Sequence, residues 1–121
     1  MARRPYLQPG RLDTKIRIER PVTEAGSYGR EVVTHWALVA TCWADRRDIT
    51  GREILEAGAE RAENRTRFII RDPHVTLDAR MRVIEIDTGQ AFGIDSIARL
   101  DQRGLGFELM CRNEDNVGAQ P

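Results

Sequence analysis

The residue types that most often carry catalysis are few in this chain and poorly spaced for it. The only serines are Ser27 and Ser96, and neither lies in the Gly-x-Ser-x-Gly turn that activates a serine nucleophile. Cys42 and His35 lie seven positions apart in one strand-like run, where such residues face opposite sides. The glycines near Gly104 precede no helix, so they do not form a phosphate-binding loop. We therefore predict that the protein is not an enzyme.

The potential metal ligands are equally scattered. Cys42 and Cys111, with His35 and His74, would form a four-ligand zinc site only if the fold gathered four distant positions, and no pair has a recurrent metal spacing. Two cysteines are also too few for a disulfide framework. Each lies in an apolar, strand-like run, which is typical of a buried free thiol. We predict no metal and no cofactor.

The length and charge of the chain argue against further classes of protein. The chain has 121 residues, which suits one domain, and its 19 basic and 19 acidic side chains give a formal net charge of zero. A neutral balance disfavours tight nonspecific nucleic-acid binding, which is driven by counterion release. Residues 1–20 and 64–83 carry an excess of basic side chains, and residues 45–63 and 84–112 an excess of acidic ones. This split predicts either complementary faces of a head-to-tail ring or an ordinary surface of interspersed charge. No apolar run is long enough for a membrane helix, and the basic N-terminus lacks the apolar region of a secretory signal.

Alternation of apolar and polar residues predicts the elements that must position any site. A first strand is expected over residues 11–20, ended by Pro21 and followed by a loop containing Gly26 and Gly29. A second, over residues 32–45, is apolar on both faces. Such a strand is covered by a core and by a neighbouring subunit, or is bent within a small barrel. Further strands are expected over 65–71, 81–86, 90–98 and 104–112.

In one segment the spacing of the apolar residues changes from that of a strand to that of a helix. Thr50 and Glu53 form a capping box, and the residues after it place a small-residue stripe on one face of a short helix. The sequence therefore predicts a mostly β fold: an antiparallel barrel or sandwich, for which we favour a small antiparallel β-barrel of about six strands, with one short helix inserted between the second and third strands. Residues 1–10 are expected to be a flexible N-terminal arm, 11–112 a single domain and 113–121 a C-terminal tail.

Several landmarks occur together in a recognisable order. They are Gly10-Arg11-Leu12 with Ile16 and Ile18, Trp36 and Trp43-Ala44 in the second strand, the block Gly51 to Gly58 (GREILEAG), Phe68 to Arg71 (FIIR), Arg82-Val83, Phe92 with Ile94, Asp101, and Phe107 to Arg112 (FELMCR). Over residues 8–112 the chain resembles the head–tail joining family of tailed bacteriophages, also called head-closure, stopper or head-tail adaptor proteins. This family occurs in phages, prophages and gene-transfer particles. The chain departs from the family pattern where Asp72-Pro73 makes a turn and where Phe92 replaces a frequent tyrosine.

The resemblance implies a structural virion connector. Its copies would form a ring between the portal/adaptor ring above and the tail-terminator or tail proteins below. The ring would close the head after packaging of double-stranded DNA, contact that DNA without reading its sequence, and provide the tail attachment surface. The protein would be assembled in the bacterial host cytoplasm and reside at the head–tail junction of the virion, with no membrane partner. Whether a ring holds six or twelve copies stays open.

The resemblance also suggests where contacts lie. Residues 46–64 are expected to be an insertion that makes inter-ring or gating contacts, through Arg46, Arg47, Arg52, Glu53, Glu56 and Arg61. A lateral subunit interface is expected at Trp36, Leu38, Trp43, Ile54 and Leu55. Arg3, Arg4 and Arg11 are expected to contact DNA or a neighbouring subunit. The alternative is a single-stranded nucleic-acid-binding module on an OB-type barrel. Against it, the loop residues Tyr6 and Tyr28 lack clear interleaving with basic residues, with the one exception of Arg3, Arg4 and Arg11 around Tyr6.

Overall fold

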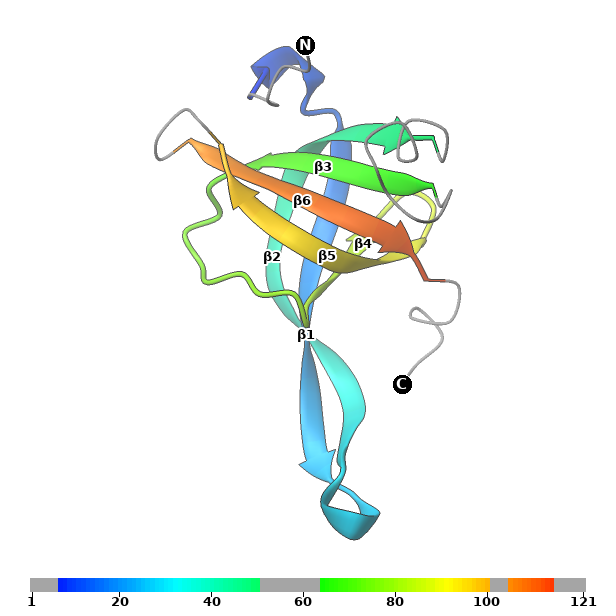
Figure 1. Ribbon diagram of the computed structural model, residues 1–121. Helices are drawn as coiled ribbons and strands as arrows, with labels where there is room; N and C mark the ends of the chain where they lie inside the picture. The colour runs from blue at the N-terminus through cyan, green and yellow to red at the C-terminus, as the bar shows by residue number, and fades with distance from the viewer. Residues whose placement is uncertain (1–6, 51–63, 101–104, 115–121) are drawn as a thin grey trace.

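Six strands form the fold in the computed structural model, which describes residues 7–50, 64–100 and 105–114 (Figure 1). Their bounds are β1 Thr14–Ala25, β2 Glu31–Ile49, β3 Arg65–Arg71, β4 Arg82–Glu85, β5 Ala91–Arg99 and β6 Gly106–Asn113. In these residues the only helical elements are two 3-10 turns, η1 at Pro9–Arg11 and η2 at Ser27–Gly29. The helix expected after Thr50 lies outside the described residues.

Antiparallel pairing runs around the whole set of strands. The order is β1-β2-β3-β6-β5-β4, and β4 pairs with β1 through Ile18 and Val83, so the six strands form a closed barrel. The predicted mostly β, six-stranded antiparallel arrangement is confirmed. Closure also leaves the barrel wall without a free sheet edge, which protects it from strand-to-strand aggregation.

Alternating strand residues fill the barrel. Phe68 and Phe92 meet edge-to-face, with ring centroids 5.2 Å apart and planes at 75°. Around them pack the aliphatic residues that face inward from the other strands, among them Ile16, Ile18, Ile70, Val83, Ile94 and Leu109. The period-two pattern of the sequence is therefore the pattern of this core.

A second, smaller cluster lies on the outside of β3. Leu7, Leu100 and Leu12 pack around Ile69, which is completely buried. The sequence assigned residues 1–10 to a flexible arm, but Leu7 is itself buried in this cluster. Leu7 and Leu12 of the segment that leads into β1 therefore pack on the barrel, whereas Pro9, Gly10 and Arg11 between them are exposed.

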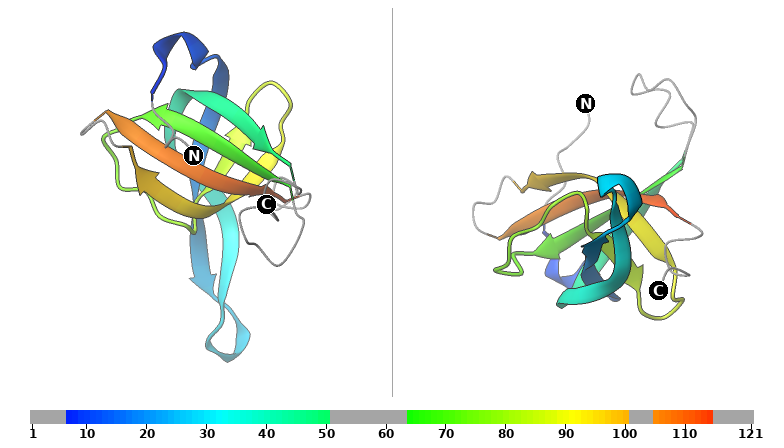
Figure 2. Two further views of the ribbon diagram at one scale, coloured as in Figure 1. Left: turned by 45° about the horizontal axis from the view of Figure 1, so that its top comes forward. Right: turned by 90° about the horizontal axis from the view of Figure 1, so that it is seen from below.

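The first strand is longer than predicted. Pro21 was expected to end it, but β1 continues to Ala25, and Pro21 pairs with Trp36 of β2. The β4 partner of β1 ends at the pairing of Glu19 with Arg82, so beyond this point β1 is paired on one side only. Proline is tolerated at such an edge because its missing N–H removes no ladder hydrogen bond. Residues 21–36, which we call the β1–β2 arm, therefore form a two-stranded ribbon that projects from the barrel (Figures 1 and 2).

The second strand also extends beyond its predicted end. Arg46 and Arg47 were expected to begin the insertion, but β2 continues to Ile49, and Arg46 pairs with Phe68 of β3. Six residue pairs with β3, from Ala44 to Ile49, hold this end of β2 in the barrel wall. Both arginines are therefore strand residues rather than loop residues.

Candidate functional site

Arg46 points to one end of the barrel interior. Its Nη1 donates to Oε2 of Glu85, its Nε donates to Oδ1 of Asp48 at 3.0 Å, and its Cζ lies 5.3 Å from the centroid of the Phe92 ring. Burial alone would lower the pKa of Arg46, but hydrogen bonds to Asp48 and Glu85 outweigh it and raise that pKa. The guanidinium therefore stays charged and closes this end of the barrel. Its expected inter-ring role is not needed to explain its position.

Arg47, the next residue, lies on the outside of the same strand. Its Nη2 donates to Oδ2 of Asp45 at 2.8 Å, and the Asp45 side chain is only 7% exposed. The Arg47 side chain itself remains 31% exposed. The Arg46 side chain is 26% exposed, so the two arginines differ mainly in their partners rather than in exposure.

Apolar side chains are exposed on the barrel wall, where the sequence predicted a lateral interface. Trp43 is 52% exposed and Leu38 is 60% exposed. Trp43 is the cross-strand partner of Lys15, whose Nζ lies 5.7 Å from its ring centroid. Ile86, also exposed, donates its backbone N–H to the carbonyl of Lys15 on the other side. Trp43 of β2, Lys15 of β1 and Ile86, the first residue after β4, thus form a row, which we call the outer row.

Trp36 occupies a different place from its predicted companions. It lies at the base of the β1–β2 arm, where the Arg82 guanidinium stacks 4.2 Å from its ring centroid. Arg82 is in turn bound by Glu19 at 2.8 Å, and both side chains are nearly buried. Trp36 lines a surface pocket of about 400 Å³, and its buried indole N–H has no hydrogen-bond partner among the described residues. It therefore supports the arm rather than lying in the outer row.

Of the remaining predicted contact residues, one lies within the described residues and the others do not. Arg11 is exposed at the end of η1. The others lie outside the described residues: Arg3, Arg4, Arg52, Glu53, Ile54, Leu55, Glu56 and Arg61.

The tip of the β1–β2 arm presents an aromatic residue that sequence reasoning left without a role. Tyr28 is fully exposed and has the left-handed backbone angles φ 62° and ψ 30°. A bulky residue is rare in this region of backbone space. An aromatic residue between Ser27 and Gly29 in a turn was the available signal, and it was interpreted only as loop composition.

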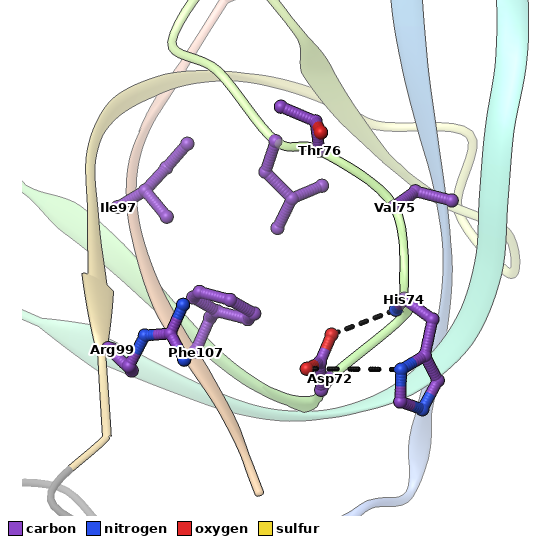
Figure 3. Close-up of a pocket in the computed structure, with 8 residues that line it drawn as sticks. Asp72, His74, Val75, Thr76, Ile97, Arg99 and Phe107 are labelled. Atoms are coloured by element: carbon purple, nitrogen blue, oxygen red, sulfur yellow. Dashed lines mark hydrogen bonds and ion pairs between the residues drawn. The ribbon is translucent and has the colours of Figure 1, made fainter. Parts of the chain in front are cut away.

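A pocket of about 450 Å³ opens on the flank of the barrel, between the loop after β3 and strands β5 and β6 (Figure 3). Leu77, Ile97 and Phe107 give it an apolar lining. Asp72 and Arg99 add opposite charges, and the Arg99 Cζ lies 5.4 Å from the Phe107 ring centroid. We call this the flank pocket. Its residues come from three separate segments of the chain, so no local sequence motif predicts this pocket.

Neither cysteine has the environment of a reactive thiol. Burial raises the pKa of Cys111 to about 12, with a further rise from Asp95, and burial raises the pKa of Cys42 to about 11. Both thiols are free. Across the described ranges, no cluster of three or more histidine, cysteine or acidic residues could hold a metal ion.

These buried thiols predict a loss of stability at alkaline pH. Above pH 9 the unfolded chain releases thiol protons that the folded chain retains, so the unfolded state is favoured as the pH rises toward 11. We expect the free energy of unfolding to be about 2 kcal/mol lower at pH 10 than at pH 8. Urea denaturation at both pH values measures this. The double variant Cys42→Ala/Cys111→Ala should lose most of the dependence, and an equal dependence in that variant would contradict the assignment.

Comparison with known proteins identifies the family. A family model described as phage head completion protein matches residues 7–114, which span every strand of the barrel. The chain belongs to the phage head completion protein family. The predicted resemblance to head–tail joining proteins is confirmed, and this membership gives the head completion protein a structural role in a phage-type head.

A solved structure supports the fold of this head completion protein. A protein of Shigella flexneri 2a, determined in solution, is similar with a TM-score of 0.69 and 23% sequence identity, covering 90% of this chain and 98% of that chain. At this identity the similarity shows the fold alone. No curated protein matches the chain. Among the described residues, no helix has the length and apolar character needed to cross a membrane.

Proposed function

We propose that the protein is a connector subunit whose copies form a ring between the portal/adaptor and the tail. The ring closes the head after DNA packaging and provides the tail attachment surface. The observation that carries the proposal is the outer row on the barrel of a head completion protein. Trp43 and Ile86 are exposed on either side of Lys15, and exposed tryptophan is typical of binding hot spots. On a closed barrel, these side chains are available to a neighbouring subunit.

We assign the lateral contact to the outer row together with Leu38. Inter-ring or gating contacts are assigned to Arg47 and to the predicted residues between β2 and β3: Arg52, Glu53, Glu56 and Arg61. Arg46 is left out because two carboxylates, Glu85 and Asp48, and the Phe92 ring engage its guanidinium, whereas the guanidinium of Arg47 is bound by Asp45. Arg3, Arg4 and Arg11 remain the proposed contacts with a neighbour or with packaged double-stranded DNA. Assembly takes place in the bacterial host cytoplasm.

The alternative, an OB-type single-stranded nucleic-acid-binding module, has less support. Base stacking needs exposed aromatic rings above a basic groove, but Phe68 and Phe92 are buried in the core, and the exposed Trp43 and Tyr28 lie apart, on the barrel wall and at the arm tip. Many arginines are also neutralised by carboxylates of the same chain. These are Arg17, Arg46, Arg47, Arg65, Arg67, Arg82 and Arg112. Each of these pairs would compete with a phosphate for the guanidinium.

Particles made without the protein test the proposal. We expect packaged heads that lose their DNA and carry no tails, because neither closure nor the tail docking surface is present. Electron microscopy counts the tailed particles, and nuclease-resistant DNA per head measures retention. Complementation with Trp43→Glu should fail, whereas Leu105→Ala, which changes an exposed apolar residue in neither the outer row nor the flank pocket, should succeed.

Two outcomes would contradict the proposal. One is a normal yield of tailed, DNA-filled particles without the protein. The other is a purified chain that binds single-stranded DNA as a monomer in moderate salt and never associates with heads, which would favour the OB-type alternative.

A further inference from the structure

The β1–β2 arm has the features of an element built to contact another molecule. Its strands pair with each other from Pro21 with Trp36 to Ala25 with Glu31, beyond the end of the β4 ladder. Figure 2 shows the arm leaving the barrel and pointing away from it. An isolated two-stranded ribbon is only marginally stable in water, because it cannot bury an apolar face by itself. A partner surface would supply the missing contacts.

Tyr28 is the side chain that such a contact would use. It is fully exposed at the tip of the arm, in a left-handed conformation that glycine would adopt at lower cost. Tyrosine is among the residues enriched in binding hot spots, because its ring gives a large contact area and its hydroxyl finds a hydrogen bond. Nothing within the described barrel requires a tyrosine here.

The flank pocket can receive that side chain. Leu77, Ile97 and Phe107 would pack against the ring, and the Arg99 guanidinium at the rim would lie over its face. The Asp72 carboxylate, already oriented by the backbone N–H of His74 at 2.8 Å, is available to accept from the phenolic hydroxyl. The volume of about 450 Å³ is large enough for a tyrosine side chain.

Charge complementarity favours a second copy of this chain as the partner. Near the tip, Glu24, Arg30 and Glu31 are exposed, so acidic side chains outnumber basic ones by one. The flank pocket has Asp72 and Arg99 in its lining, and the exposed Arg71 next to Asp72 gives this surface an excess of one basic side chain. An arm that enters the pocket would place acidic residues close to basic ones, which gives the contact a preferred orientation.

We propose that Tyr28 of one copy inserts into the flank pocket of the next copy, an inference that rests on the proposed ring. The tip and the pocket are different surfaces of one molecule (Figures 1 and 3). The contact is therefore heterologous: each copy gives its arm to one neighbour and receives an arm from the other. A closed rotation of this contact produces a ring.

Substitutions at Tyr28 separate docking from folding. Tyr28→Ala should weaken self-association at least about 30-fold, as expected for loss of a hot spot. Tyr28→Gly should weaken it equally while leaving the melting temperature unchanged or higher, because glycine relieves the left-handed strain. Tyr28→Phe should lose about fivefold, the effect of one hydrogen bond. Ser27→Ala, at the adjacent exposed position, is the matched control and should change nothing. Sedimentation over a concentration series measures all four variants.

Two experiments address the pocket itself. Thr76→Phe places a ring in the pocket from an exposed position, so it should block association as strongly as Tyr28→Ala. A photoreactive benzoylphenylalanine at position 28 should cross-link to the tryptic peptide of residues 72–80 of another copy, both at high protein concentration and on assembled particles. Mass spectrometry of the linked peptides identifies the site.

The outcomes distinguish this contact from the ring itself. Cross-links from position 28 to a different protein, to a different surface, or to nothing in both preparations would overturn the inference. Normal association of Tyr28→Ala would do so as well. These outcomes would contradict only the contact made by Tyr28. The proposed function would still be supported if particles made without the protein had no tails. If particles without the protein were normal, the proposed function would fail independently.

Discussion

Replacing Gly106 by alanine is expected to destabilise the barrel by about 3 kcal/mol or more. A Cβ at this position would lie 1.9 Å from the carbonyl oxygen of Ile70, 3.0 Å from its carbonyl carbon and 3.2 Å from the Cα of Arg71. All three are backbone atoms of β3, which pairs here with β6. No side-chain rotation can relieve the clash, so the two strands must separate where Arg71 faces Gly106.

Chemical denaturation of Gly106→Ala measures the effect directly. Gly10→Ala is the matched control, because a Cβ there has nothing within 4 Å. That variant should stay within about 0.5 kcal/mol of the natural protein or gain slightly through a less flexible unfolded chain. A Gly106→Ala protein with unchanged stability would show that the β3–β6 ladder adjusts without cost.

Replacing Arg46 by alanine is expected to lower the free energy of unfolding by about 3 kcal/mol. The change leaves the Glu85 carboxylate, which is 9% exposed, without the guanidinium that neutralises it. Thr88 still donates its hydroxyl to Oε1 of Glu85, but a neutral donor compensates only part of a buried charge. The stacking of the guanidinium on Phe92 is lost as well.

The adjacent strand provides the control for Arg46→Ala. Arg17 is 44% exposed and lies 3.4 Å from Glu19, and Glu19 keeps Arg82 when Arg17 is removed. Arg17→Ala should therefore cost less than about 1 kcal/mol. The double variant Arg46→Ala/Glu85→Gln should regain part of the loss, because no buried charge is left alone. Equal losses for Arg17→Ala and Arg46→Ala would contradict the placement of Arg46 inside the barrel.

The strands were predictable because their cores repeat every second residue. Ile16 and Ile18, or Phe68 and Ile70, face inward from one strand with a polar or outward-facing residue between them. The ends of the strands were harder to predict. Pro21 normally indicates the end of a strand. It is tolerated here because β4 begins only at Arg82, opposite Glu19, and so does not pair with β1 at Pro21. No residue near Pro21 in the sequence indicates this.

The same reasoning explains the error at Arg46. A charged residue after an apolar run predicts a loop, unless its counter-ion is known. Here the counter-ion is Glu85, 39 positions away in the chain. Sequence periodicity contains no information about such a pair, so an inward-facing arginine and a loop arginine have the same local pattern.

The candidate contacts show a similar division. Leu38 and Trp43 were identified because apolar residues on both faces of a strand exceed what one core can bury. Tyr28 and the flank pocket were not identified. The pocket exists only where the loop after β3 meets β5 and β6, and its receptive shape is a property of the folded chain.

The filled barrel has a consequence for passage through the virion. Phe68 and Phe92 occupy its centre, and Arg46 with Glu85 closes one end. Six strands enclose too narrow a space for anything but their own side chains. In the proposed ring, a conduit for a nucleic-acid duplex would therefore have to lie between subunits, and its bore would be determined by how many copies surround it. Under that proposal, each copy would contribute one segment of the conduit wall.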